Sequence, residues 1–194
     1  QAINSKLFDY IIFSSNDDEL LHISSRYSNI FSVKRSENLS LPYSSKWEVF
    51  RDAIRHFEDK TMLSLNPSTV ICDLDISVPL RGVEDIIGVI ESYKHNTILI
   101  TAYESERNPY FNMVEKKGQN YGVVVNSVIG VQNRQEAKQV YSLSSSVFCF
   151  NYLQLFELSH WSQGVLDIYP IPRKRGFDLD TSDDYEYFKA ISND

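Results

Sequence analysis

The chain has 194 residues and a formal net charge of -7 at pH 7, a length that suits one domain with a substantial core. Hydrophobic residues make up 42% and charged residues 23%, which excludes a disordered or fibrous protein. No apolar run reaches the roughly 18 residues of a membrane span, and no basic face is present for nucleic acid. We therefore expect a cytoplasmic protein with neither a membrane nor a nucleic-acid partner.

Strands and helices alternate through the first half of the chain. Short apolar runs predict the strands, and apolar residues at helical spacing, such as Trp47, Phe50, Ile54 and Phe57, predict the helices. The expected order is a strand at 10–13, a helix from 17, a strand at 30–33, a helix from 44 or 45, a strand at 69–74, a helix after 79 and a strand at 97–101. Helical crossovers between strands predict a three-layer α/β fold with a mostly parallel sheet, in a single domain over 1–194.

The character of the sequence changes after Tyr103. Polar sequence over about 104–139 encloses apolar runs at 122–125 and 128–131, which predict a hairpin that projects from the main sheet. The expected elements beyond it are a strand at 146–150, a helix near 152–158, a strand at 165–169, an extended segment at 177–180 and a helix from about 182.

The two cysteines carry little signal. Cys72 and Cys149 each lie within an apolar run, and neither a CxxC motif nor a zinc-ligand spacing is present. We expect both to be reduced core residues.

Two Asp-Leu-Asp triplets, at 73–75 and 178–180, are the clearest candidates for chemistry. Residues i and i+2 of a strand face the same side, so each triplet would present two carboxylates a few ångströms apart. Such oxygen pairs suit Mg²⁺ bound together with a phosphate, although a solvated strand end has the same pattern. The sequence contains no Gly-rich phosphate loop, no GxSxG motif and no paired histidines.

Six segments are distinctive when they are taken in order. They are FDYIIFSSN at 8–16, RSENLS at 35–40, DLDISVPLR at 73–81, NPYFNMVE at 108–115, RQEAKQVY at 134–141 followed by SSSVF at 144–148, and FDLDT at 177–181. Together they resemble the acylneuraminate (sialic acid) cytidylyltransferases, and among these the bacterial group that acts on legionaminic-type nonulosonic acids. The resemblance implies a Rossmann-like nucleotidyltransferase fold and a reaction of CTP with a nine-carbon 2-keto sugar acid, with Mg²⁺ as cofactor.

The resemblance also implies roles for individual residues. Asp178 and Asp180 would be catalytic and hold Mg²⁺, while Ser14, Ser15 and Arg35 would bind the nucleotide. The expected sugar-side contacts are Asp75, Arg134, Gln135, Ser144 and Phe148.

The chain departs from the family pattern at its start. The opening strand and the loop that holds the CTP triphosphate have no counterpart, so the strand at 10–14 should border a gap or a neighbouring chain. Two alternatives therefore stay open: a non-catalytic homologue, and a glycosyltransferase that uses an Asp-x-Asp metal site. We also expect a homodimer through 104–139, with the valines at 123, 125, 128 and 131 as its contact surface, because a lone hairpin is marginally stable.

Overall fold

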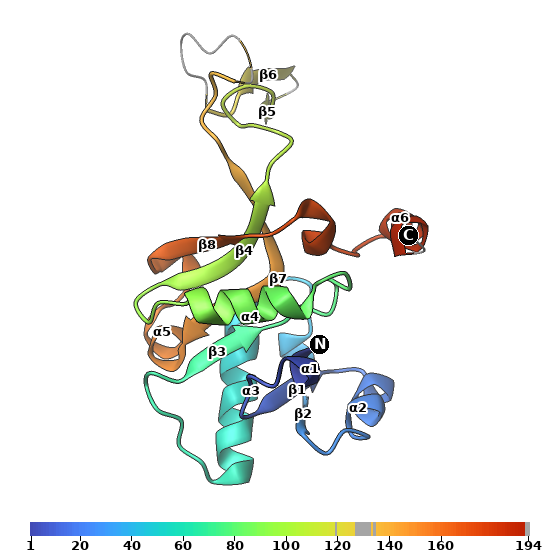
Figure 1. The fold of residues 1–194 in the computed structure, drawn as a ribbon, viewed down its shortest axis with the longest axis vertical. Helices are drawn as coiled ribbons and strands as arrows, with labels where there is room; N and C mark the ends of the chain where they lie inside the picture. The colour runs from blue at the N-terminus through green and yellow to red at the C-terminus, as the bar shows by residue number, and fades with distance from the viewer. Residues whose placement is uncertain (119, 127–132, 134, 193–194) are drawn as a thin grey trace.

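The computed structural model describes residues 1–118, 120–126, 133 and 135–192. An α/β body carries a long arm that projects from the ends of two strands (Figure 1). The elements in chain order are α1 (Ala2–Ser5), β1 (Ile11–Ser15), α2 (Asp18–Ser24), β2 (Ile30–Lys34), η1 (Glu37–Leu39), α3 (Lys46–Thr61), β3 (Val70–Asp73), α4 (Val83–Ser92), β4 (Ile98–Glu104), β5 (Val114–Lys117), β6 (Asn120–Val124), β7 (Tyr141–Asn151), α5 (Tyr152–Glu157), η2 (Trp161–Gln163), β8 (Leu166–Pro170), η3 (Arg173–Gly176) and α6 (Ser182–Ser192). Within the described ranges, no helix is both long enough and apolar enough to cross a membrane.

Four strands form the central sheet in the order β3-β7-β4-β8. β4 and β8 pair in parallel, whereas β7 runs antiparallel to both β3 and β4. β3, β4 and β8 therefore share one direction, and β7 alone opposes them. β1 and β2 form a separate parallel pair. The predicted α/β class with a mostly parallel sheet is confirmed.

The central sheet lies between two layers of helices. On one face, Phe148 and Phe150 of β7 pack with residues of α3 and α5. On the other face, Val147 and Cys149 of the same strand pack with α4. Alternate residues of a strand face opposite sides, so β7 contributes to both cores and the fold has three layers.

A gap separates β1 from the central sheet. Among the described residues β1 pairs with β2 alone and β3 pairs with β7 alone, so each strand keeps one free edge. A cavity of about 970 Å³ lies against both strands, and its lining includes Ile12 and Ser14 of β1 and Ile71 and Asp73 of β3. The gap that the sequence predicts beside β1 is therefore present.

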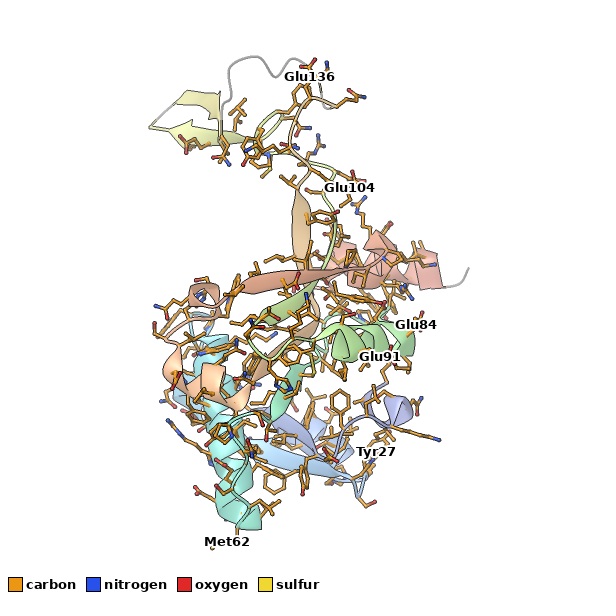
Figure 2. The ribbon with its side chains drawn as sticks, turned by 60° about the vertical axis from the view of Figure 1, so that its left-hand side comes forward. Tyr27, Met62, Glu84, Glu91, Glu104 and Glu136 are labelled. Carbon is orange, nitrogen blue, oxygen red and sulfur yellow. A yellow bond between two sulfur atoms is a disulfide. The ribbon has the colours of Figure 1, made fainter. Side chains whose placement is uncertain are left out.

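The projecting arm is built from the ends of β4 and β7 and carries β5 and β6 (Figure 2). β5 and β6 pair antiparallel around Gly118, whose positive φ of 61° suits a tight turn. The apolar run at 122–125 thus overlaps β6, and the partner that the structure describes for β6 is β5. The run at 128–131, its predicted partner, lies outside the described residues.

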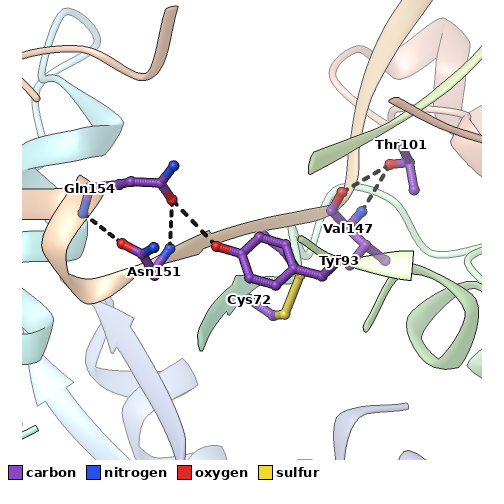
Figure 3. Close-up of a disulfide and its surroundings, with 7 residues drawn as sticks. Cys72, Tyr93, Thr101, Val147, Asn151 and Gln154 are labelled. Carbon is purple, nitrogen blue, oxygen red and sulfur yellow. Dashed lines mark hydrogen bonds between the residues drawn. A yellow bond between two sulfur atoms is a disulfide. The ribbon is translucent and has the colours of Figure 1, made fainter. Parts of the chain in front are cut away.

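A bulge in β7 connects the sheet to the loop after β3. The buried Thr101 hydroxyl fills the bulge: it donates to the Ser144 carbonyl over 2.8 Å. It also accepts from the Val147 amide over 3.0 Å (Figure 3). The Ser145 carbonyl then accepts the amide of Asp75 over 3.4 Å. Bulges re-aim the backbone beside functional sites, and this one anchors the loop that carries the first Asp-Leu-Asp triplet.

Cys72 and Cys149 form a disulfide in this structure, so the expectation of two free thiols is wrong (Figure 3). The two residues lie directly opposite each other on β3 and β7, with Cα atoms 4.4 Å apart. That separation is typical of a non-hydrogen-bonded antiparallel pair, in which side chains approach most closely. The sequence shows two apolar runs but does not show that their register aligns the cysteines.

Candidate active site

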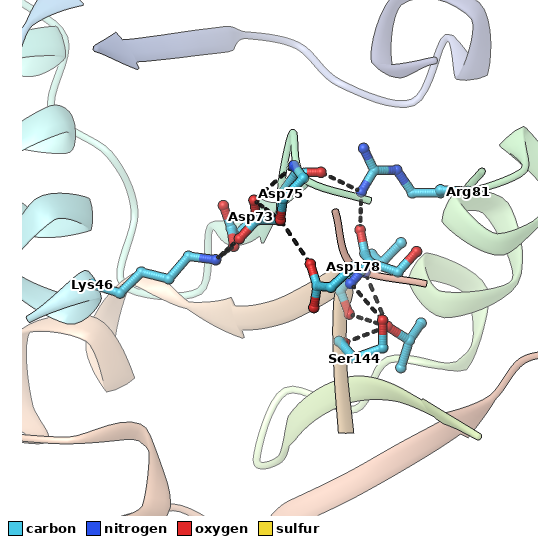
Figure 4. A network of polar contacts seen from close by, with 10 residues as sticks. Lys46, Asp73, Asp75, Arg81, Ser144 and Asp178 are labelled. Carbon is cyan, nitrogen blue, oxygen red and sulfur yellow. Dashed lines mark hydrogen bonds and ion pairs between the residues drawn. The ribbon is translucent and has the colours of Figure 1, made fainter. Parts of the chain in front are cut away.

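Lys46 lies between the two carboxylates of the first Asp-Leu-Asp triplet. Its Nζ atom is 2.6 Å from Oδ2 of Asp73 and 2.6 Å from Oδ2 of Asp75 (Figure 4). Burial lowers the pKa of Lys46, but the attraction of Asp73 and Asp75 outweighs burial, and the net pKa is raised. Lys46 is therefore charged at neutral pH and balances both carboxylates.

The two carboxylates of this triplet have different environments. Burial raises the pKa of Asp73, and the nearby Lys46 only partly offsets it. Burial also acts on Asp75, but hydrogen bonds from Lys46 and Ser77 outweigh it and lower the pKa of Asp75. Asp75 is thus the more strongly stabilised anion of the pair.

Ser77 joins the first triplet to the second. Its Oγ atom lies 3.0 Å from Oδ1 of Asp75 and 2.7 Å from Oδ1 of Asp178. Its amide also donates to Oδ1 of Asp75 over 3.1 Å, and its carbonyl accepts the amide of Leu179 over 2.8 Å. Two segments that are about a hundred residues apart in sequence therefore meet at one serine.

The second triplet does not lie in a strand, contrary to the extended strand that we predicted. Residues 177–180 are irregular, with Asp178 half-buried and Asp180 exposed. Within the described residues, their backbone contacts are made to Ser77 and to the helix that follows, and none is made to a strand. Asp184 Oδ2 accepts the amide of Thr181 over 2.8 Å and the Thr181 hydroxyl accepts the amide of Asp184 over 3.2 Å, a capping box that begins α6.

The residues predicted to bind the nucleotide meet at the end of β1. Arg35 donates from Nε to the Ser14 hydroxyl over 3.2 Å and from Nη2 to the Ser14 carbonyl over 2.6 Å. The amide of Arg35 donates to the carbonyl of Ser15 over 2.8 Å. Ser14 and Arg35 line the same cavity as Lys46, Asp73 and Asp75. The structure therefore brings Ser14, Arg35 and the first triplet to one cavity, whereas Ser15 is buried and is not part of its lining.

Two predicted sugar contacts are buried in this structure. Phe148 is 5% exposed and its ring packs 6.2 Å from that of Trp47, measured between centroids. Ser144 is 2% exposed, and its hydroxyl donates to the carbonyl of Gly176 over 3.1 Å. Both side chains contribute to packing here and are closed to a substrate from solution.

Gln135, another predicted sugar contact, belongs to the arm. Gln135 is exposed, and its amide donates to Oδ1 of Asn133. The next residue, Glu136, lies at the far end of the arm from the body (Figure 2). Arg134 lies outside the described residues. The structure therefore does not bring Gln135 to the cavity of its own chain.

Lys46, Ser77 and Arg81 complete the network, although the site predicted from sequence included none of them. Ser77 and Arg81 fall within the 73–81 segment, which is the signal that could have identified them. Arg81 is buried and donates to the carbonyls of Asp75, over 3.1 Å, and Ser146, so it fixes the loop. Lys46 has no such signal, because its role depends on how α3 packs against β3.

Carboxylate oxygens of the kind that Asp178 and Asp180 offer suit Mg²⁺. In the part of the chain that the structure describes, no group of three or more His, Cys, Asp or Glu side chains converges on one point. Mg²⁺ commonly takes one or two carboxylates and completes its octahedron with water and substrate phosphates. Two carboxylates, such as those of Asp178 and Asp180, are therefore within the number that Mg²⁺ takes from a protein, although neither residue lines the cavity that contains Arg35 and Lys46.

Two solved structures have the same fold. The 4-diphosphocytidyl-2C-methyl-D-erythritol synthase of Anaerococcus prevotii aligns with a TM-score of 0.66 at 16% identity, covering 100% of this chain and 85% of that one. A second 4-diphosphocytidyl-2C-methyl-D-erythritol synthase aligns with a TM-score of 0.61 at 10% identity, covering 96% and 84%. At these identities the comparison supports the fold alone.

Comparison with curated sequences gives relatives over nearly the whole chain, whereas no protein-family profile matches. The chain is 31% identical to the post-translational flagellin modification protein B of Campylobacter coli over 194 residues, which are 98% of this chain and 80% of the relative. It is 32% identical over 193 residues, with the same coverage, to the CMP-N,N'-diacetyllegionaminic acid synthase of Campylobacter jejuni. The pseudaminic acid cytidylyltransferase of Campylobacter jejuni is 23% identical over 197 residues. Because this similarity extends through both Asp-Leu-Asp segments and the residues that connect them, the chain belongs to the nonulosonic acid cytidylyltransferase family.

Proposed function

We propose that the protein transfers CMP from CTP to a nine-carbon 2-keto sugar acid of the sialic, legionaminic or pseudaminic type. The observation that carries this proposal is the 32% identity to a CMP-N,N'-diacetyllegionaminic acid synthase over 98% of the chain. In the reaction the anomeric hydroxyl of the sugar acid attacks the α-phosphate of CTP. The bond from the α-phosphate to the bridging oxygen breaks, pyrophosphate leaves and the hydroxyl proton is released.

The charges around the cavity support a nucleotide as ligand. Arg35, Lys46 and Arg81 line it together with Asp73 and Asp75. Cationic side chains attract phosphate oxygens, and arginine does so with directed hydrogen bonds. Lys46 is already balanced by the two carboxylates, so Arg35 is the cation that we assign to the nucleotide. A cytoplasmic location, where CTP is made, is part of the same proposal.

Asp178 and Asp180 are the residues that we assign to Mg²⁺. The ion would offset charge on the phosphates and on the departing pyrophosphate. Asp75 is less available, because Lys46 occupies its Oδ2 atom and Ser77 its Oδ1 atom. Asp178, within the described part of the chain, accepts hydrogen bonds through Oδ1 only, which leaves Oδ2 for an ion.

A homodimer formed through the arm is a further part of the proposal. Met113, Val114 and Val125 are exposed on the arm, and grouped apolar side chains on a surface favour a protein interface. A two-stranded hairpin gains stability when it packs on another surface. Gln135, on the same arm, would then reach a sugar acid at the partner's site rather than at its own.

The test is an assay of the purified protein with CTP and MgCl₂ in separate reactions with N-acetylneuraminic, legionaminic and pseudaminic acid. We expect pyrophosphate release that depends on the sugar acid, and an equal amount of CMP-sugar detected by mass spectrometry. ATP, GTP and UTP serve as controls. Transfer from a preformed sugar nucleotide without pyrophosphate release would favour a glycosyltransferase, and neither reaction would favour a non-catalytic homologue.

A further inference from the structure

We propose that Ser77 is a positioning residue that orients the carboxylate of Asp178 toward the metal and nucleotide. The inference rests on the proposed function for the identity of that ligand. Its structural basis is the pair of contacts from Ser77 to the 177–180 segment: the hydroxyl to Asp178 over 2.7 Å and the carbonyl to the Leu179 amide over 2.8 Å.

The Ser77 hydroxyl has one proton and two carboxylates within reach, so it can donate to only one of them at a time. Asp75 already has other donors, namely Lys46 Nζ at 2.6 Å from Oδ2 and the Ser77 amide at 3.1 Å from Oδ1. Asp178 is the closer acceptor, at 2.7 Å against 3.0 Å for Asp75. The geometry therefore assigns the hydroxyl proton to Asp178.

The position of Asp178 depends on this contact because residues 177–180 belong to no strand or helix. Removing the hydroxyl alone leaves the Ser77 carbonyl in place for the Leu179 amide, and it leaves the Ser144 bond to Gly176 just upstream. The segment should stay docked while the Asp178 carboxylate loses its orientation. Loss of such an outer hydrogen bond to a metal-binding carboxylate typically weakens metal binding 10–100-fold.

A purely local role for Ser77 has to be separated from this one. Its amide and hydroxyl both contact Oδ1 of Asp75 two residues earlier, which by itself is a common turn. Ser68 makes the same turn with Asn66, at 2.9 Å from its amide and 2.8 Å from its hydroxyl. Ser68→Ala is therefore a matched control that removes the turn contact without touching Asp178.

The experiment compares wild type, Ser77→Ala, Ser77→Thr and Ser68→Ala. Binding of Mn²⁺ in the presence of CTP is measured by electron paramagnetic resonance, and folding is monitored by circular dichroism and thermal unfolding. We expect Ser77→Ala to bind Mn²⁺ about 10–100-fold more weakly while it remains folded. Ser77→Thr keeps a hydroxyl and should bind like wild type, as should Ser68→Ala.

Wild-type Mn²⁺ affinity in Ser77→Ala would overturn the inference. The inference would also be overturned if Ser77→Thr lost as much Mn²⁺ affinity as Ser77→Ala, or if the wild-type protein bound no Mn²⁺ in the presence of CTP. Failure of the proposed function looks different: no sugar acid supports pyrophosphate release, yet the order of Mn²⁺ affinities among the variants is retained. That pattern would support the role of Ser77 and reject the assigned reaction.

Discussion

The ammonium of Lys46 lies 2.6 Å from the Oδ2 atom of Asp75 and at the same distance from Asp73. One cation in the first turn of α3 thus balances two carboxylates at the end of β3. Removal of a charge from such a partly buried cluster leaves the opposite charge uncompensated. This cluster fixes α3 to the edge of the cavity that also contains Arg35.

We expect Lys46→Met to lower the free energy of unfolding by about 1–3 kcal/mol, less than for a fully buried pair because Lys46 is partly exposed. Urea denaturation measures the change. Lys94→Met is the matched control: Lys94 pairs with Asp167 at 3.6 Å on an exposed surface, and its loss should change stability by under about 0.5 kcal/mol. Equal effects of the two substitutions would contradict a special role for Lys46.

The pKa values of Asp73 and Asp75 should lie on opposite sides of the ordinary aspartate value of 3.8, with that of Asp73 above it and that of Asp75 below it. Both pKa values can be measured from the pH dependence of the carboxyl carbon NMR shifts. The variants Asp73→Asn and Asp75→Asn assign each signal to its residue. The stabilising contribution of Asp75 is present above pH 3.8 and is lost as the pH falls through its lowered folded pKa. The contribution of Asp73 has the opposite sign: it is present below pH 3.8 and is lost as the pH rises through its raised folded pKa. Identical titration of the two groups would show that Lys46 and Ser77 do not distinguish them.

Gly88→Ala should destabilise the protein by about 1–3 kcal/mol, despite the better helix propensity of alanine. A Cβ atom at this position of α4 would lie 2.1 Å from the hydroxyl oxygen and 2.6 Å from the Cζ atom of Tyr169 on β8. Thermal unfolding measures the loss. The double variant Gly88→Ala/Tyr169→Leu, compared with Tyr169→Leu alone, should show little further loss, and a persistent penalty would place the clash elsewhere.

Asp180→Asn should remove most sugar-dependent pyrophosphate release at limiting Mg²⁺ while the fold stays intact, because an amide would replace the charged carboxylate that we assign to Mg²⁺. Asp73→Asn should act mainly on stability, since Asp73 is held by Lys46 at the end of β3. Initial rates over a range of MgCl₂, together with thermal unfolding, separate the two effects. Full activity of Asp180→Asn at limiting Mg²⁺ would remove Asp180 from the metal site.

Val114→Glu and Val125→Glu should each convert the expected dimer to monomer, because both residues are exposed on the arm and a charge in an apolar interface is costly to desolvate. Sedimentation velocity at micromolar concentration measures the change. Val165→Glu, an equally simple change at an exposed site of the body, should leave the dimer unaffected. A wild-type monomer at high micromolar concentration would contradict dimerisation.

The order of elements could be predicted from local sequence, for a physical reason. Apolar periodicity records which side of an element is buried, so the α3 stripe of Trp47, Ile54 and Phe57 and the buried runs of β4 and β7 are visible before any fold is known. The crossovers between strands then restrict the sheet to a mostly parallel one. The ordered segments that contain Arg35, Asp75 and Asp178 are likewise visible in the sequence, and they indicate the family to which the chain belongs.

Which residues contact one another was decided only by the tertiary structure. Lys46 meets Asp75 because α3 packs beside β3, and Ser77 meets Asp178 although 101 positions separate them. Cys72 meets Cys149 through strand register, and Phe148 is buried because its side of β7 faces α3 and α5. Local patterns encode burial and backbone preference, whereas these contacts depend on how distant segments close together. For that reason the sequence located both carboxylate triplets, and only the folded chain revealed the serine that joins them.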